Sequence, residues 1–292
     1  MNIMMCAAAL LAMVLAGPAL AQSTPNSTTA SHLALVIRGG YLVNGIAGCG
    51  NCHTPKGPDG VDLPGRDLAG GGTIEIPNLF LARMPNITQD RDTGIGAWTD
   101  AQIALAIREG KRPDGRVIGP PMPIELYRHT ADHDLAAIVA YLRTIRPVRN
   151  EVAKSEYHVP LPPNYGAPVQ SVAAPANTPE ARGAYLAGPL GHCTECHTPV
   201  GANGQRDWSR LGAGGPPIPG PAGVVVPRNI SSHRTAGIGA WSDAQIIRAV
   251  TEGISADGRR LSPPMAFGYY ARMNRGDLAD LVAWLRTVPA QP

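Results

Sequence analysis

A five-residue pattern, Cys-x-x-Cys-His, occurs twice in this chain and constrains its fold more than any other feature. The copies span residues 49–53 and 193–197, and each is followed by Thr-Pro. Two thiols separated by two residues, with an imidazole directly after them, form the attachment signature of c-type haem. The thiols can add to the two vinyl groups at one edge of the porphyrin, which places the histidine beneath the iron. We therefore expect two covalently bound haems c, held by Cys49, Cys52, His53, Cys193, Cys196 and His197.

Three other chemistries use paired cysteines: a structural disulfide, a thioredoxin-like redox pair and a four-cysteine zinc site. A zinc site would need both pairs to meet from distant parts of the chain, and it would leave the two trailing histidines unexplained. A redox pair needs neither the histidine nor a second copy. Haem attachment accounts for all six residues and is the interpretation that we adopt.

The first 21 residues predict export from the cytoplasm. Residues 3–21 contain no charged side chain, and this apolar run ends in Ala19-Leu20-Ala21 before a polar tract. The pattern is typical of a secretory signal peptide that is cleaved after Ala21. The alternative is an uncleaved anchor, because the run is nearly long enough to span a bilayer. Cys6 lies within this segment, and we expect the mature chain in the periplasm.

The chain contains an internal duplication. Residues 86–145 match residues 229–288 at 30 of 60 positions without gaps. Self-similarity of this extent indicates two copies of one structural unit. We expect one haem-binding domain over residues 22–146 and a second over 181–292. The Pro-rich stretch over 147–180 is expected to be an extended, fairly stiff linker between them.

The duplication also predicts a second ligand for each iron. Four methionines follow the predicted signal peptide, and only Met122 and Met265 occupy matching positions, each after a Pro-Pro pair. Prolines stiffen a loop and can hold a thioether sulfur toward a metal. The alternative is that these methionines fill the core, which is the usual role of methionine. The matched Pro-rich setting favours ligation, and histidine–methionine ligation is typical of electron-transfer haems.

The sequence predicts an all-α fold of short helices and long loops. The chain has 34 glycines and 29 prolines among 292 residues, which argues against long helices or a large sheet. The first copy should have one helix over residues 32–46, a second that follows a capping box at Thr99, and a third that ends near Arg143. The second copy should repeat them. The stretches 57–72 and 201–223 show no strand periodicity and are expected to be loops.

Several residues that occur in both copies are candidates for contacts with the haem propionates. An indole N–H at a helix start can donate a hydrogen bond to a carboxylate, but a tryptophan there can equally serve in packing. A side-chain amide can donate in the same way. The candidates are Trp98, Trp241, Asn86 and Asn229. For Tyr41 and Tyr185 we expect a place in the helix core rather than a redox role.

Six sequence segments follow one another in a fixed order: C-x-x-C-H-T-P, P-N-I-T, T-G-I-G-A-W-T-D, R-E-G-x-R-P-D-G-R, P-P-M-P and D-L-A-A-I-V-A-Y-L-R. This order resembles that of class I cytochrome c domains. More narrowly, it is similar to the cytochrome c subunits of periplasmic alcohol, gluconate and aldehyde-type dehydrogenases. The resemblance covers nearly all of both repeats and implies two tandem cytochrome c domains. It also implies that His53 and Met122 ligate one iron, and His197 and Met265 the other.

The resemblance implies that the chain is an electron-transfer protein rather than an enzyme. The expected donor is a dehydrogenase or another oxidoreductase, and the expected acceptor is a downstream cytochrome or oxidase. The subunits that it resembles usually carry three haem domains and often a membrane-binding tail, whereas this chain has two repeats. We therefore expect membrane contact only through a partner or an uncleaved N-terminus. The net charge of +3, without a basic run, argues against nucleic-acid binding.

Two other functions stay open. One is a dihaem redox enzyme, either peroxidase-like or sulfur-oxidising, and the other is a fixed electron-transfer subunit of a membrane-associated dehydrogenase complex. A peroxidase needs an iron with an open face, which a methionine in both copies disfavours. A cysteine-ligated site would need a further cysteine in the mature chain.

Overall fold

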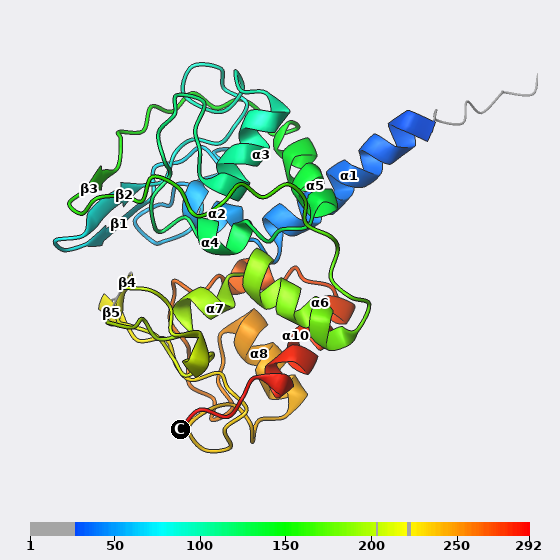
Figure 1. Cartoon of the computed structure of the whole chain (residues 1–292), viewed down its shortest axis with the longest axis vertical. Coiled ribbons are helices and arrows are strands. Elements are labelled where there is room, and N and C mark those ends of the chain that lie inside the picture. Colours follow the sequence, from blue (N-terminus) through cyan, green and yellow to red (C-terminus); the bar gives the residue numbers. More distant parts are fainter. Residues whose placement is uncertain (1–26, 203, 221–222) are drawn as a thin grey trace, which may run out of the picture.

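The computed structural model describes residues 27–202, 204–220 and 223–292, and its two halves lie one above the other (Figure 1). The predicted signal peptide, residues 1–21, and Cys6 lie outside the described residues. Within these described ranges, no helix is both long and apolar enough to cross a membrane.

The two halves contain the same series of helices, as the duplication predicts. In the N-terminal half they are α1 (Ser27–Asn44), α2 (Cys49–His53), α3 (Asp100–Glu109), α4 (Ile124–Tyr127) and α5 (Asp132–Leu142). In the C-terminal half they are α6 (Pro179–Tyr185), α7 (Cys193–Cys196), α8 (Asp243–Glu252), α9 (Phe267–Tyr270) and α10 (Arg275–Thr287). A π-helical turn, η1 (Leu186–Leu190), extends α6, and a 3-10 turn, η2 (Trp208–Arg210), follows α7. The three helices predicted for the first copy are present, although α1 is shifted toward the N-terminus.

Matching local signals start α3 and α8. The side chains of Thr99 and Ser242 accept hydrogen bonds of 3.2 Å from the backbone N–H groups of Gln102 and Gln245. The glutamine side chains accept in return from the backbone N–H groups of Thr99 and Ser242, which completes a capping box at each helix. The capping box predicted from the sequence is therefore confirmed.

In each half the first helix crosses the last helix at very short range. A Cβ atom at Gly39 of α1 would lie 1.9 Å from the carbonyl oxygen of Ala137 in α5. A Cβ atom at Gly183 of α6 would lie 2.0 Å from the carbonyl oxygen of Asp280 in α10. Only glycine permits such an approach. Gly39 and Gly183 occupy matching positions in the two repeats, and each allows the helix pair from which the Cys-x-x-Cys-His segment extends.

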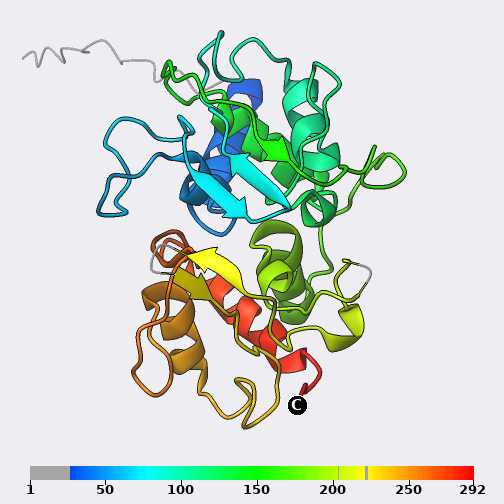
Figure 2. The ribbon, with the colours of Figure 1, turned by 90° about the vertical axis from the view of Figure 1, so that its left-hand side faces the viewer.

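Two small antiparallel sheets lie on one side of the molecule (Figure 2). The first has the order β1 (Thr73–Ile76), β2 (Phe80–Arg83), β3 (Glu156–Tyr157), and the second pairs β4 (Ile218–Gly220) with β5 (Gly223–Val225). The all-α expectation is wrong in this region, and residues 201–223 are not loop throughout. Strands of two to four residues give too little alternation to be recognised in a sequence. In addition, β3 pairs with a strand that is distant along the chain.

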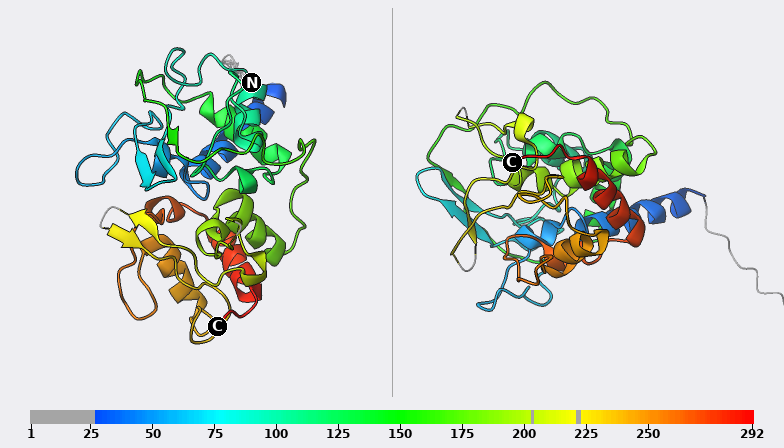
Figure 3. Two further views of the ribbon diagram at one scale, coloured as in Figure 1. Left: turned by 60° about the vertical axis from the view of Figure 1, so that its left-hand side comes forward. Right: turned by 90° about the horizontal axis from the view of Figure 1, so that it is seen from below.

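The Pro-rich stretch over 147–180 packs against the N-terminal half before the chain enters the C-terminal half (Figure 3). The backbone N–H of Val169 donates a 2.8 Å hydrogen bond to the carboxylate of Glu109. Arg128 lies 3.3 Å from the same carboxylate and also donates to the carbonyl of Ala167. Both charged side chains are buried, and their hydrogen bonds to the backbone of Val169 and Ala167 attach the linker to the first repeat.

One hydrophobic core runs through both halves. Leu42 and Ile46, in and just after α1, are at most 1% exposed and belong to the same buried cluster as Leu186 and Leu190 of η1. Burial of apolar surface is the dominant favourable term in folding. The halves are therefore joined by side-chain packing as well as by the linker.

Candidate functional site

The first Cys-x-x-Cys-His motif forms α2, a single helical turn. Gly48 precedes it in the left-handed conformation, with φ 52°, and turns the chain from α1 into α2. Cys49 and Cys52 are half-buried, form no disulfide and lie three residues apart on one face of the turn. Burial raises the pKa of the Cys49 thiol to about 12, which keeps it protonated at neutral pH. The two thiols thus project in the arrangement that attachment to one porphyrin edge requires.

The second motif repeats this geometry with different neighbours. Cys193 and Cys196 form α7, and His197 follows directly. His192 takes the place of the glycine and has a φ of 41°, although it carries a side chain. Burial raises the pKa of the Cys193 thiol to about 11 and that of Cys196 to about 12.

A backbone carbonyl fixes each of the two motif histidines. The Nδ1 atom of His53 lies 2.8 Å from the carbonyl oxygen of Pro85, and that of His197 lies 2.6 Å from the carbonyl oxygen of Arg228. A carbonyl can only accept, so Nδ1 carries the proton and Nε2 keeps a free lone pair. Burial lowers the pKa of both imidazoles, which favours the neutral, ligating form. Sequence analysis missed Pro85 and Arg228, because every residue has a backbone carbonyl and the residue type therefore gives no signal.

Met122 and Met265 lie in two loops of the same design. Each follows a cis Pro-Pro bond, and each carbonyl accepts a hydrogen bond from the backbone N–H two residues later, at 2.8 and 3.0 Å. Both methionines are half-buried, whereas Met84 and Met273 are only 6% exposed and serve as core residues. Ligation of iron by Met122 and Met265 stays a prediction.

The linker holds the loop that leads to Met122. The hydroxyl of Tyr165 donates a 2.7 Å hydrogen bond to the carbonyl of Ile118, and that of Tyr157 donates a 3.0 Å bond to the carbonyl of Pro120. Both acceptors lie within four residues of Met122. Sequence analysis missed this role for the two tyrosines, because it treated the linker as a spacer.

The two candidate tryptophans directly precede the capping boxes of α3 and α8. Trp98 and Trp241 are half-buried against the core, and their carbonyls accept hydrogen bonds from Arg143 and Arg286. Within the described part of the chain, neither indole N–H has a hydrogen-bond partner. Donation to a haem propionate therefore stays a prediction for both residues.

The two candidate asparagines brace loops inside the protein. The amide N–H groups of Asn86 donate to the carbonyl of Val148 at 2.8 Å and to the hydroxyl of Thr93 at 3.0 Å. The amide of Asn229 donates to the carbonyl of Gln291 at 2.8 Å. The side-chain oxygens accept from backbone N–H groups two residues later. These bonds hold the segments that supply the histidine acceptors, and contact of the asparagines with a propionate stays a prediction.

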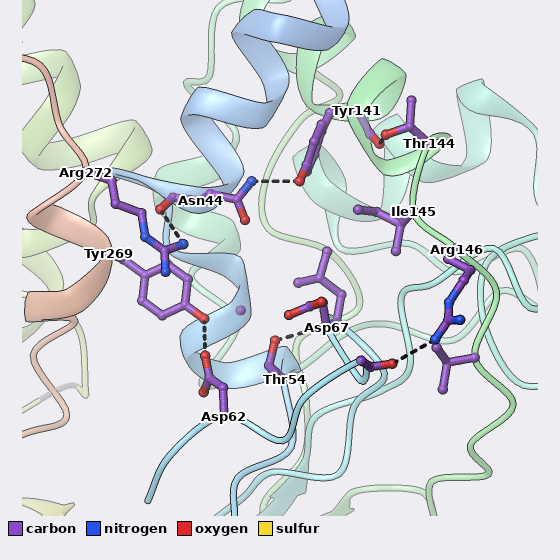
Figure 4. Close-up of a pocket in the computed structure, with 14 residues that line it drawn as sticks. Asn44, Thr54, Asp62, Asp67, Tyr141, Thr144, Ile145, Arg146, Tyr269 and Arg272 are labelled. Atoms are coloured by element: carbon purple, nitrogen blue, oxygen red, sulfur yellow. Dashed lines mark hydrogen bonds between the residues drawn. The ribbon is translucent and has the colours of Figure 1, made fainter.

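An open pocket of about 520 Å³ lies where the two halves meet, beside α2 (Figure 4). Its lining combines Tyr269 and Arg272 of the C-terminal half with residues of the N-terminal half. Tyr269 donates a 3.1 Å hydrogen bond to Asp62, and Asn44 donates to the hydroxyl of Tyr141 at 2.7 Å. Several polar groups that line the pocket thus form hydrogen bonds with other residues of the protein. We therefore interpret the pocket as a gap at the contact between the halves and not as a ligand site.

Paired thiols on one face of a helical turn, followed by an anchored neutral imidazole, define the class of c-type cytochromes. No protein-family model matches the chain. The chain is 31% identical over 256 residues to a dihaem c-type cytochrome of Cereibacter sphaeroides. The aligned region covers 83% of this chain and 82% of that protein. The chain belongs to this family of c-type cytochromes, and the resemblance inferred from the sequence is confirmed.

Two further relatives are subunits of dehydrogenases. The chain is 31% identical over 288 residues to the fructose dehydrogenase cytochrome subunit of Gluconobacter japonicus, covering 93% of this chain and 56% of that protein. It is 31% identical over 231 residues to the gluconate 2-dehydrogenase cytochrome c subunit of Pantoea cypripedii, covering 72% of this chain and 49% of that protein. The chain thus spans about half the length of these dehydrogenase subunits.

Membership of the family implies covalently bound haem c, and the side chains fit it. Arg112 stacks 5.2 Å over the ring of Trp98, and its Nε is buried without a hydrogen-bond partner. In the C-terminal half the Nε of Arg248 is also buried without a hydrogen-bond partner. Another nitrogen of its guanidinium donates to the carbonyl of Ser255, and Ser255 occupies the position of Arg112 in the second repeat. The Nε of Arg112 also lies 4.0 Å from the carboxylate of Asp114. A buried guanidinium group with an unused N–H donor can pair with a further anion, which the propionates of a haem can supply. Sequence analysis did not identify either arginine.

Proposed function

We propose that this chain is a periplasmic cytochrome that carries two haems c and transfers electrons from a partner dehydrogenase to a downstream cytochrome or oxidase. Its two haem-binding domains span residues 22–146 and 181–292. The observation that carries the proposal is the duplicated donor set, in which each repeat combines paired thiols, an anchored imidazole and a matched methionine. A haem held by such ligands supplies one-electron chemistry between ferric and ferrous iron.

The residues of the chain have four tasks in this function. The thiols of each motif attach the porphyrin, and the carbonyls of Pro85 and Arg228 hold the imidazoles in the ligating tautomer. Met122 and Met265 complete the coordination and exclude other ligands. Arg112 and Trp98, which contact each other, would supply a cationic and an N–H donor to the propionates of the first haem, and Trp241 an N–H donor to those of the second.

Intact mass spectrometry of the protein purified from periplasm tests the first part of the proposal. We expect the mass of the chain from Gln22 onward plus two haems, and the haem should remain attached after acid–acetone extraction. A single haem, or haem that extracts freely, would contradict the proposal. Retention of residues 1–21 would contradict only the predicted cleavage.

A fixed place within a dehydrogenase complex is a second candidate, which the similarity to dehydrogenase subunits favours. The relatives from fructose dehydrogenase and gluconate 2-dehydrogenase are both cytochrome subunits. Affinity purification of this chain from periplasm and membranes, followed by activity staining with sugar and alcohol substrates, distinguishes the two cases. A stable complex with a dehydrogenase supports the fixed subunit, and a free protein that a separate dehydrogenase reduces supports the shuttle.

A further inference from the structure

The first Cys-x-x-Cys-His motif contacts the loop that carries the second methionine. The side-chain amide of Asn51, between Cys49 and Cys52, donates a 3.1 Å hydrogen bond to the carbonyl oxygen of Pro264. Pro264 directly precedes Met265, and the two bonded residues are 213 positions apart in the sequence. A single hydrogen bond thus connects the segment that attaches one haem to the loop that carries the predicted iron ligand of the other.

The surrounding packing holds this contact in place. A Cβ atom at Gly50 would lie 2.3 Å from the hydroxyl of Tyr269, so a larger residue at this position would displace the tyrosine side chain of α9. Tyr269 in turn donates to Asp62, which lies shortly after the first motif (Figure 4). A Cβ atom at Gly48 would lie 3.7 Å from the Cβ atom of Ala266, the residue after Met265, so the two segments lie close together. The loop of the second methionine therefore lies against the first motif on both sides of the hydrogen bond.

The reverse contact is absent among the described residues, and the reason is chemical. Glu195 occupies the position of Asn51 in the second motif, and an ionised carboxylate can only accept hydrogen bonds. It therefore cannot donate to the carbonyl of Pro121, and it lies 3.4 Å from the Nδ1 atom of His192 instead. The Met122 loop is held by linker tyrosines, whereas the Met265 loop is held by Asn51.

We propose that Asn51 is a positioning residue for Met265, so that the first haem motif holds the axial ligand of the second haem. The inference rests on the proposed function, since it takes Met265 to be an iron ligand. A fixed carbonyl one residue before Met265 reduces the number of loop conformations in which the sulfur faces away from the iron. Removal of the donor should therefore shift the equilibrium of the second haem toward the form in which Met265 is released.

The test measures methionine release at each haem separately. Imidazole competes with a methionine sulfur for ferric iron, and loss of the near-infrared sulfur-to-iron band reports the exchange. In a Met122→Ala background this band reports Met265 alone, and in a Met265→Ala background it reports Met122 alone. Asn51→Ala should raise the apparent imidazole affinity of the second haem about fivefold, the effect of one hydrogen bond of ordinary strength on an equilibrium constant. The first haem should not change.

Two further variants separate the hydrogen bond from general effects. Asn51→Leu keeps the side-chain volume without the donor and should behave like Asn51→Ala. Tyr41→Phe removes a different hydrogen bond between the halves and should leave both imidazole affinities unchanged. Unchanged affinity at the second haem in Asn51→Ala, or an equal change in Tyr41→Phe, would overturn the inference. Absence of a sulfur-to-iron band from the Met122→Ala protein, fully loaded with haem, would instead refute the proposed ligation by Met265.

Discussion

The phenol of Tyr41 in α1 donates a hydrogen bond of 2.6 Å to the carboxylate of Asp277 in α10. The duplication supplies the reciprocal contact, because Tyr185 in α6 donates to Asp134 in α5 at 2.9 Å. Each tyrosine matches the other in the repeat, and so does each aspartate. The halves therefore face one another across an approximate twofold relationship. The expectation that Tyr41 and Tyr185 serve in the helix core is incomplete, since both are half-buried and join the halves.

We expect these reciprocal bonds to stabilise the whole protein rather than one half. Tyr41→Phe keeps the ring and removes the donor, which should lower the free energy of unfolding by about 1 kcal/mol. Tyr185→Phe should have a similar effect. Chemical denaturation of the haem-loaded protein, followed by circular dichroism, measures the change. A variant with unchanged stability would show that water replaces the bond at no cost.

Local features of the fold could be predicted from the sequence, and contacts between the halves could not. The capping box at Thr99 and the paired methionine loops depend on residues close together in the chain, so their patterns are visible. The bonds of Asn51 to Pro264 and of Tyr41 to Asp277 join residues more than 200 positions apart. They depend on how two similar units face each other, which no local pattern specifies.

Tyr165 should influence the first haem and not the second. Its hydroxyl donates to the carbonyl of Ile118, four residues before Met122, so Tyr165→Phe frees one end of that loop. We expect the imidazole affinity of the first haem to rise by up to about fivefold. Titration in the Met265→Ala background measures this haem alone. An equal rise at the second haem would show that the linker affects the protein as a whole.

The half-buried tyrosines should make the protein sensitive to alkali. Burial raises the pKa of Tyr165 to about 12, with smaller contributions from Tyr157 and Glu125. Its pKa in an unfolded chain is about 10, so folding favours the protonated phenol. The stability that it contributes is complete below pH 10 and is lost as the pH rises from about 10 to about 12. Burial raises the pKa of Tyr41 and Tyr185 as well, in the same direction.

Denaturation midpoints measured from pH 8 to pH 12 test this expectation. The midpoint should fall above about pH 10, and Tyr165→Phe should fall less steeply because it has one fewer phenol to ionise. Since haem ligands can also exchange in alkali, the sulfur-to-iron band is recorded in parallel. A fall in stability that is as steep in Tyr165→Phe as in the unaltered protein would contradict the assignment to this residue.

The paired methionines decide between an electron carrier and an enzyme. If Met122 and Met265 both ligate iron, neither haem has a free position for a substrate or a small gas. The ferrous protein should then remain low-spin and bind carbon monoxide slowly or not at all. Thioether ligation stabilises ferrous iron, so both potentials should exceed those of haems ligated by two histidines in similar surroundings.

Single substitutions should open one haem at a time. Met122→Ala should allow rapid carbon monoxide binding and lower the potential at the first haem, with the second unchanged, and Met265→Ala should do the opposite. Each repeat has its own anchored histidine, so the effects should be independent apart from the contact through Asn51. Flash photolysis and potentiometric titration measure both properties. Rapid carbon monoxide binding or peroxide turnover by the unaltered protein would mean that one methionine is not a ligand, and a peroxidase-like function would then account better for that haem.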